Sequence, residues 1–322
     1  MAVQAKTKKI YDDIRTLRIQ GADEAAAAAL EALRIEGLAS KARNRKDFFS
    51  DLRASALYLK TVRPTEPELR NALRLVFTAV HKSPSDDVAE LKHGLDKQVE
   101  KYEENLKKVR GKIAEYGARL VPDGGTVLVH CHSGSVVAVL KKAFDEEIDF
   151  KVFACETRPL YQGRKTARQL SEYGIPTTLV VDSAARLVLT RFMRDSDVVL
   201  VGADAITSEG DLVNKIGTSQ VALSAFEHEK HVYSCAGTHK FDPLTLWGSG
   251  EPIEERDSSE VAVSGDFKLK KFPKALHVFN PAFDVTEAKY VNAFVTELGV
   301  LPPQSLVMAV WKELGLSEKQ LI

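Results

Sequence analysis

Residues 122–135, PDGGTVLVHCHSGS, decide the fold of this chain. The PDGG segment predicts a turn, and the apolar run 126–130 that follows it predicts a buried strand. Before this stretch, apolar residues recur at helical spacing, whereas after it short apolar runs alternate with helix-like segments. The period of the sequence therefore changes here, and we expect two domains, residues 1–120 and residues 121–322.

The N-terminal domain is predicted to be almost entirely helical. Segments 22–36, 46–60 and 66–80 carry helical patterns, and a longer helix carries one apolar stripe with spacings of three and four residues. The stripe consists of Val88, Leu91, Leu95, Val99, Tyr102, Leu106, Val109, Ile113, Tyr116 and Leu120. We interpret this stripe and the alanine run 25–29 as close packing between helices.

The C-terminal domain is predicted to be a Rossmann-like α/β domain. Apolar runs predict strands at 126–130, 152–155, 177–181, 198–201, 232–235 and 276–279. Helix-like segments separate most of them, at 136–147, 162–173, 184–193 and 216–229. Continuous apolar strands that alternate with helices indicate a doubly wound, mostly parallel sheet that is buried on both faces. The polar segment 251–264 predicts a loop or a hairpin excursion.

Composition narrows the class of protein. The 322 residues include 45 Lys and Arg and 45 Asp and Glu, so the net charge is zero and nothing favours binding to nucleic acid. No run reaches the roughly 18 apolar residues of a membrane span, and the first residues lack the apolar segment of a signal peptide. Three cysteines are too few for a disulfide framework, so we expect a protein of the reducing cytoplasm.

Cys131 follows the first predicted strand and precedes a helix expected to begin near Val136. Ligands of doubly wound sheets collect at the carboxyl ends of strands, and a helix dipole should lower the pKa of a nearby thiol. Cys131 is therefore a candidate nucleophile or base. The N–H groups of residues 133–135 suit an anion at the helix start, although an ordinary turn capped by serine explains them nearly as well.

A metal site at His130, Cys131 and His132 is not expected. In an extended chain the two imidazoles would point one way and the thiol the other, so one ion could not take all three. Cys155 and Cys235 also end strands and are interpreted as core residues.

Asp204 and several cations follow other predicted strands. A partly desolvated carboxyl group at Asp204 could act as a general acid, and its alternative role is to cap a turn. Arg158 is a candidate clamp for a phosphate or a carboxylate, or a salt-bridge partner of Glu156 or another acid. Together the cations suit a substrate with two phosphates, although each alone could be a solvated surface charge. The other polar candidates are Asn214, Lys215 and Lys240.

Four motifs in this order resemble those of one superfamily. They are His130-Cys131, Glu156-Thr157-Arg158-Pro159, Gly202-Ala203-Asp204 and Asn214-Lys215-Ile216-Gly217-Thr218. The superfamily contains methylthioribose-1-phosphate isomerase, archaeal ribose-1,5-bisphosphate isomerase and the regulatory subunits of translation initiation factor 2B. The resemblance covers nearly the whole chain, including Arg63-Pro64-Thr65.

The resemblance implies an enzyme, because the regulatory subunits generally lack the Cys131 and Asp204 pair. Segments 181–186 and 238–241 look more like the ribose-1,5-bisphosphate branch, and residues 20–23 lack the proline of the methylthioribose enzymes. The implied activity is an aldose–ketose isomerase of AMP or nucleoside breakdown that makes ribulose 1,5-bisphosphate. The alternatives are a methylthioribose-1-phosphate isomerase and a non-catalytic regulatory subunit.

The resemblance also implies roles for individual residues. Asp204 would protonate the ring oxygen and Cys131 would remove the C2 proton, with no metal or redox cofactor. Gln20 stands where relatives usually have arginine, which removes a charge-assisted bond that Arg18 could replace. The phosphorylated pentose would contact Gln20, Gly21, Ala22, Asp23, Arg63, Ser133, Gly134, Ser135, Arg158, Asn214, Lys215 and Lys240. Relatives form dimers or hexamers, so a homo-oligomer is expected.

Overall fold

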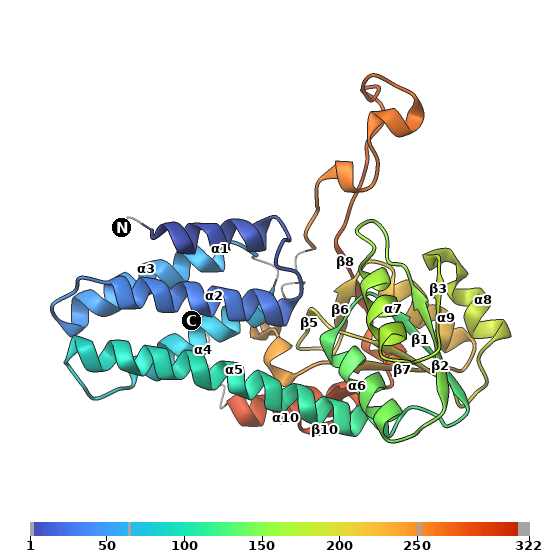
Figure 1. Cartoon of the computed structure of the whole chain (residues 1–322), viewed down its shortest axis with the longest axis horizontal. Helices are drawn as coiled ribbons and strands as arrows, with labels where there is room; N and C mark the ends of the chain where they lie inside the picture. Colours follow the sequence, from blue (N-terminus) through green and yellow to red (C-terminus); the bar gives the residue numbers. More distant parts are fainter. Residues whose placement is uncertain (1–2, 64–65, 249, 251–252, 315–322) are drawn as a thin grey trace. The chain divides into compact units, whose positions relative to one another are not determined.

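The computed structural model describes residues 3–63, 66–248, 250 and 253–314 (Figure 1). Pro64 and Thr65 of the Arg63-Pro64-Thr65 motif lie outside the described residues. Contacts divide the chain into two compact units, Met1–Val109 and Arg110–Ile322. We call them the helical unit and the α/β unit. The division falls inside a helix, N-terminal to the boundary expected at residue 120.

The helical unit is built from helices, as its sequence pattern predicts. The helices are α1 (Ala5–Arg15), α2 (Ala22–Ala39), α3 (Arg45–Lys60), α4 (Pro67–His81) and α5 (Val88–Ala118), of which α5 continues into the α/β unit. Asn44 caps α3 by accepting the N–H of Asp47, and Pro67 occupies the first turn of α4, where its missing N–H costs nothing.

Small residues on α2 allow the neighbouring helices to approach closely. Ala25, Ala26 and Ala29 are fully buried, and α2 packs against α1, α3 and α4. A Cβ atom on Gly37 would lie 2.2 Å from Cδ2 of Leu95, which leaves no room for a side chain there. The alanine run is therefore a packing feature, as expected.

The α/β unit contains a seven-stranded sheet with the order β10-β9-β7-β4-β1-β2-β3. Every neighbouring pair is parallel except β9 and β10. The strands are β1 (Gly125–His130), β2 (Phe150–Cys155), β3 (Thr177–Val180), β4 (Val198–Val201), β7 (His231–Cys235), β9 (Ala293–Thr296) and β10 (Gly299–Leu301). A smaller sheet joins β5 (Ala205–Ile206), β6 (Leu212–Lys215) and β8 (Phe283–Thr286).

Helices cover both faces of the large sheet. Leu128 and Val199 pack in one core cluster with Val188 of α8 and Val221 of α9. Because side chains alternate along a strand, the next residues of β1 and β4 face the opposite side, where α6 and α7 contact each other. The helices are α6 (Gly134–Asp145), α7 (Gln162–Glu172), α8 (Ala185–Arg191), α9 (Thr218–Glu227) and α10 (Pro303–Leu314). The predicted doubly wound fold is confirmed.

Short 3-10 helices complete the α/β unit. They are η1 (Asp182–Ala184), η2 (Thr238–Lys240), η3 (Pro243–Trp247), η4 (Ser258–Glu260), η5 (Ser264–Phe267) and η6 (Ala288–Tyr290). Among the described residues, no helix is both long and apolar enough to cross a membrane.

The strand predicted at 276–279 is wrong. This segment belongs to an arm, residues 253–280, that stands out from the α/β unit in Figure 1. The N–H of Arg256 bonds the carbonyl of Asn280 (2.9 Å) at the base of the arm, so the predicted excursion of 251–264 is confirmed over its described residues. Phe279 is 73% exposed, so its apolar run has no sheet to join, and β9 takes the expected place beside β7.

Gly163 offers a direct test of how closely α7 approaches β2. A Cβ atom there would lie 1.7 Å from the carbonyl oxygen of Cys155, whereas one on Gly111 of α5 would meet nothing within 4 Å. We expect Gly163→Ala to lower the free energy of unfolding by about 3 kcal/mol, because α7 must move away. Gly111→Ala should raise it by about 0.5–1 kcal/mol through helix propensity. Urea unfolding of both variants measures the change in the free energy of unfolding. Equal midpoints for the two variants would contradict the close approach of α7 to β2.

Candidate active site

The candidate site lies where the order of strands reverses. The chain runs outward from β1 to β2 and β3, and from β4 to β7 and β9, so β1 and β4 flank the switch point of the sheet. His130 pairs with Val201 in the register of these two strands. Cys131 and Asp204 therefore follow neighbouring parallel strands at their carboxyl ends, where ligands of such sheets bind.

Cys131 leaves the strand in the left-handed region, with φ of +68°. Its N–H donates to Oγ1 of Thr157 (2.9 Å), and its carbonyl accepts from Oγ1 of Thr166 (3.0 Å). Non-glycine residues pay about 1–2 kcal/mol for this conformation, so these bonds must hold it. The chain is therefore not extended at Cys131, which was the condition of the argument against a metal site at residues 130–132.

The turn at Cys131 separates the two neighbouring histidines. Nε2 of His130 lies 2.9 Å from the carbonyl of Ile216, and Nδ1 of His132 lies 3.0 Å from Oγ1 of Thr166. Each imidazole is thus bonded to a different part of the α/β unit. No group of three possible metal ligands in the described part of the chain includes the thiol of Cys131.

The thiol of Cys131 is less acidic than the sequence predicts. Burial raises its pKa to about 11, the positive charge of Lys215 lowers it, and the negative charge of Asp204 raises it. The predicted lowering by the helix dipole is wrong, because desolvation outweighs it. The two charges nevertheless act on the thiol, so the side chains of Asp204 and Lys215 lie near Cys131.

Gly202 allows two loops to meet beside Asp204. A Cβ atom on Gly202 would lie 2.8 Å from Cβ of Ser133 and 3.9 Å from Oδ1 of Asn214. The loop after β1 therefore packs against the turn after β4. Asp204 is half-buried, and its N–H donates to the carbonyl of Val213 (2.9 Å). Its role as the proton donor stays a prediction.

Helix α6 begins at Gly134, earlier than the predicted start near Val136. Ser133 caps it through an Oγ that accepts the N–H of Val136 (3.4 Å). The N–H groups of Gly134 and Ser135 have no hydrogen-bond partner among the described residues and are free to bind an anion. The serine cap and the anion site, which the sequence left as alternatives, are compatible.

Arg110 is a residue of this site that the sequence did not single out. Nη2 of Arg110 lies 3.4 Å from the position that a Cβ on Gly134 would take, and its charge helps to lower the pKa of His132. Burial is the main cause of that shift, to about 4. In the sequence Arg110 is one of many charges on a long helix, so nothing marked it.

Three further predicted residues surround the turn at 202–204. Nζ of the buried Lys240 donates to the carbonyl of Ala203 (2.9 Å). The neighbours Asn214 and Lys215 lie on β6, where Nζ of Lys215 is 4.5 Å from the centre of the Phe283 ring. The structure thus brings Lys215 and Lys240 to one edge of the sheet.

Arg158 reaches the arm. Its exposed guanidinium donates to the hydroxyl of Tyr161 and to the carbonyl of Val261 (2.9 Å). The alternative of a salt bridge is wrong, because Glu156 pairs with Arg164 (2.7 Å) and no other acid of the described residues pairs with Arg158. Contact between Arg158 and a substrate stays a prediction.

The remaining predicted contacts lie in the helical unit. Gly21 has φ of +92° and precedes α2, whose first turn holds Ala22 and Asp23. Arg63 is buried and pairs with Glu66 (2.6 Å). Gln20 directly precedes Gly21, and the guanidinium of Arg18 pairs with Asp13 (2.6 Å). Substrate contacts of Gln20, Gly21, Ala22, Asp23 and Arg63 stay predictions.

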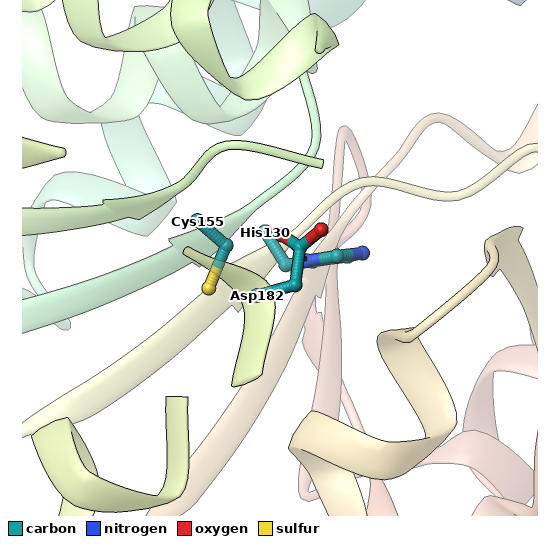
Figure 2. A group of neighbouring side chains, drawn as sticks. All are labelled: His130, Cys155 and Asp182. Atoms are coloured by element: carbon teal, nitrogen blue, oxygen red, sulfur yellow. Dashed lines mark ion pairs between the residues drawn. The ribbon is translucent and has the colours of Figure 1, made fainter. Parts of the chain in front are cut away.

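A polar cluster lies beside Cys131 at the ends of three strands. Figure 2 shows His130, Cys155 and Asp182, whose ligand atoms all lie within 4.8 Å of one another, so they form a group that could hold a metal ion. Nδ1 of His130 is 4.0 Å from Oδ1 of Asp182, and burial lowers the pKa of this imidazole. Burial also raises the pKa of Cys155 to about 12.

Asp182 has no predicted role of its own, because the sequence singles it out only within the segment 181–186. Its Oδ1 accepts the N–H of Thr157 (2.8 Å) and its Oδ2 accepts the N–H of Arg158 (2.7 Å). Both bonds run to the end of β2 from the segment after β3, so Asp182 ties these two strand ends together. A cavity of about 190 Å³ opens beside Asp182 and His130 and is also lined by Arg186 and Gln220.

Most of the chain matches a known family. The model of the initiation factor 2 subunit family matches residues 18–303. This chain belongs to that family. The ribose 1,5-bisphosphate isomerase of Thermococcus kodakarensis is 38% identical over 321 residues, which is 99% of this chain and 98% of that protein.

Two more relatives are similar to this chain along most of their length. The ribose 1,5-bisphosphate isomerase of Methanocaldococcus jannaschii is 40% identical, covering 97% of this chain and 96% of its own. The 5-deoxyribose 1-phosphate isomerase of Moorella thermoacetica is 39% identical, covering 92% of this chain and 86% of its own.

Solved structures of this family share the fold. The structure of 5-methylthioribose 1-phosphate isomerase from Pyrococcus horikoshii has a TM-score of 0.79 at 29% identity, and the match covers 96% of this chain and 88% of that one. The structure of translation initiation factor eIF-2B from the same organism has a TM-score of 0.76 at 26% identity, with 93% and 98% covered. One scaffold thus carries proteins named as enzymes and proteins named as translation factors.

Asp284 fixes the start of α9 beside the site, and its removal should destabilise the fold. Its carboxylate accepts from the N–H of Gly217 (2.7 Å) and from the hydroxyl of Ser219 (2.8 Å). We expect Asp284→Ala to lower the free energy of unfolding by about 2 kcal/mol, because the partly buried N–H of Gly217 and hydroxyl of Ser219 lose their acceptor. Asp149→Ala is the control, since that exposed side chain makes no hydrogen bond or ion pair with the described residues. Urea unfolding measures both variants. Equal losses of the free energy of unfolding in the two would contradict the role of Asp284 as the cap of α9.

Proposed function

We propose that this chain is an aldose–ketose isomerase that converts ribose 1,5-bisphosphate to ribulose 1,5-bisphosphate. The observation that carries the proposal is the identity of 38–40% over nearly the whole chain to proteins named ribose 1,5-bisphosphate isomerase. The shared location of Cys131 and Asp204 at the switch point supports it, because the reaction needs a base and an acid close together.

The first half of the reaction opens the sugar ring. A sugar that is phosphorylated on its anomeric oxygen cannot open spontaneously. Asp204, when protonated, gives its proton to the ring oxygen as the bond from C1 to that oxygen breaks. The thiolate of Cys131 takes the proton from C2, and the electron pair of that bond forms the C1–C2 double bond of an enol phosphate.

The second half converts the enol phosphate to the ketose. The thiol of Cys131 returns its proton to C1, and the carboxylate of Asp204 takes the proton of the C2 hydroxyl as the carbonyl forms. Both residues then regain their starting states. While Asp204 holds a proton, the negative charge that raises the pKa of Cys131 is absent, and Lys215 favours the thiolate. The proton on Asp204 therefore assists both steps.

Phosphate binding is supported by the start of α6 and the cations around it. The free N–H groups of Gly134 and Ser135, together with Arg110, suit one phosphate. Lys215 and Lys240 add positive charge on the other side of the Gly202 turn. Contacts from Gln20–Asp23 and Arg63 are proposed from the resemblance alone. The same resemblance supports a cytoplasmic homo-oligomer, a dimer or a hexamer, that acts in AMP or nucleoside breakdown.

Substrate choice is tested by comparing three sugar phosphates. Relatives named for 5-deoxyribose 1-phosphate and methylthioribose 1-phosphate are 39% and 36% identical, so both compounds are candidates. We expect kcat/KM for ribose 1,5-bisphosphate to exceed both by about 100-fold, because only this substrate offers a second phosphate to the cations. Ketose formation followed by NMR measures this. A higher value for either monophosphate would reassign the substrate, and turnover of none by folded protein would favour a regulatory role.

The acid and the base are tested by conservative substitutions. Cys131→Ser and Asp204→Asn should each lower kcat by about 10²–10⁴-fold while substrate binding is largely kept. Cys235→Ser is the matched control, because Cys235 also ends a strand and is buried, yet no charged group contributes to the shift of its pKa, and it should retain activity. Steady-state kinetics and equilibrium binding separate the two effects. Near-normal turnover by either site variant would show that its assigned role is wrong.

A further inference from the structure

We infer that Thr157 and Asp182 are positioning residues that hold the backbone of Cys131 in the conformation that presents its thiol to the site. The inference rests on the proposed function for its effect on turnover. The arrangement of Asp182, Thr157 and Cys131 does not depend on that function. It consists of hydrogen bonds across the ends of three neighbouring strands, β1, β2 and β3.

Two adjacent strands end in the same unusual conformation. Cys131 after β1 has φ of +68°, and Thr157 after β2 has φ of +63°. Neither is a glycine, and a threonine, with its branched Cβ, is especially unsuited to the left-handed region. Such residues persist only where their surroundings impose the conformation, and they concentrate at functional sites. The two turns therefore need an identifiable constraint.

The constraint on Cys131 is the hydroxyl of Thr157, which is fully buried. This hydroxyl donates its single proton to the carbonyl of Cys155 (3.2 Å) and accepts the N–H of Cys131 (2.9 Å). Because its donor is already used, it can only accept from Cys131. The direction of both bonds is thereby fixed, and the peptide of the reacting residue is tied to β2.

The constraint on Thr157 is the carboxylate of Asp182. Its two oxygens accept the consecutive N–H groups of Thr157 (2.8 Å) and Arg158 (2.7 Å). The register of β2 and β3 pairs Cys155 with Val180, so Asp182 and Thr157 stand opposite each other, each two residues beyond that pair. Figure 2 shows the Asp182 side chain directed back toward the ends of β1 and β2, where His130 and Cys155 lie.

We call the series of hydrogen bonds from Asp182 through Thr157 to the backbone of Cys131 the relay. A second threonine adds a further bond to Cys131. Oγ1 of Thr166 on α7 donates to the carbonyl of Cys131 (3.0 Å), so both backbone groups of Cys131 are bonded to threonine side chains. Displacement of a reacting group by about 1 Å can lower a rate by about 100-fold. Loss of the Thr157 hydroxyl should therefore lower turnover more than binding.

Thr157→Val tests the relay, because it removes the hydroxyl at nearly constant volume. We expect kcat to fall by about 10- to 100-fold with KM changed by less than about threefold. Thr157→Ser keeps the hydroxyl and should restore kcat to within about threefold of the wild type. Thr126→Val is the matched control, since Thr126 is a buried threonine at the other end of β1 whose hydroxyl bonds the carbonyl of Phe192 (3.1 Å).

Alkylation of Cys131 by iodoacetamide gives a readout that does not need the proposed function. Cys155 and Cys235 are buried, so in folded protein the modified peptide should contain Cys131. We expect Thr157→Val to raise the rate constant at least about threefold, because a released turn exposes the thiol and removes part of its desolvation. Thr157→Ser and Thr126→Val should react as the wild type does. If Thr157→Val leaves both kcat and this rate unchanged, the inference is overturned.

A double variant tests the first link of the relay. Asp182→Asn replaces one carboxylate acceptor by a donor, so it should lower kcat in the same direction as Thr157→Val. If Asp182 acts through Thr157, the double variant should lose no more activity than Thr157→Val alone. Multiplied losses would show that Asp182 does not act through Thr157. If the wild type turns over no sugar phosphate, the proposed function fails, and the alkylation rates of the same variants still decide the relay.

Discussion

The parallel pairing of β1 with β4 is the constraint on which the candidate site depends. His130 lies opposite Val201 in this pairing, and the chain leaves the two strands in opposite directions across the sheet. The connections therefore diverge from the carboxyl ends of these two strands, which is where ligands of such sheets bind. Cys131 and Asp204 follow these ends, and a slip of one residue would move one of them by about 3.3 Å. Gly202 adds to the constraint, because any side chain there would meet Ser133.

Burial and charge act on the thiol in opposite directions. Desolvation raises the pKa of Cys131 to about 11, and Lys215 offsets only part of that shift. A buried thiol beside a carboxylate stays neutral, but the same thiol beside a carboxylic acid loses the repulsion that opposes its ionisation. One proton shared between Cys131 and Asp204 is thus enough for the proposed chemistry. The low dielectric that suppresses the free thiolate also strengthens its interaction with Lys215 once it forms.

The sequence predicted the elements that local periodicity determines and missed those that distant contacts determine. The change of period at residues 122–135 predicted β1, and the apolar stripe predicted α5. Both predictions depend only on the spacing of apolar residues. The run 276–279 has the composition of a strand, yet no neighbouring strand lies beside the arm. The conformation of Cys131 was missed because Thr157 and Thr166, which bond its backbone, are more than 20 residues away. Arg110 approaches α6 only in the fold, so no local pattern could mark it.

The bonds that build this site involve the backbone of Cys131 and Asp204, which suits a scaffold shared by proteins named as an enzyme and as a translation factor. The N–H and carbonyl of Cys131 are bonded to threonines, and the N–H of Asp204 is bonded to Val213. Replacement of the thiol or the carboxylate leaves all of these bonds in place. The fold can therefore survive replacement of Cys131 and Asp204, the proposed base and acid, whereas Thr157 and Gly202 hold the backbone whichever residue stands at position 131. Similar structures named as an isomerase and as a translation factor, with TM-scores of 0.79 and 0.76, fit that division.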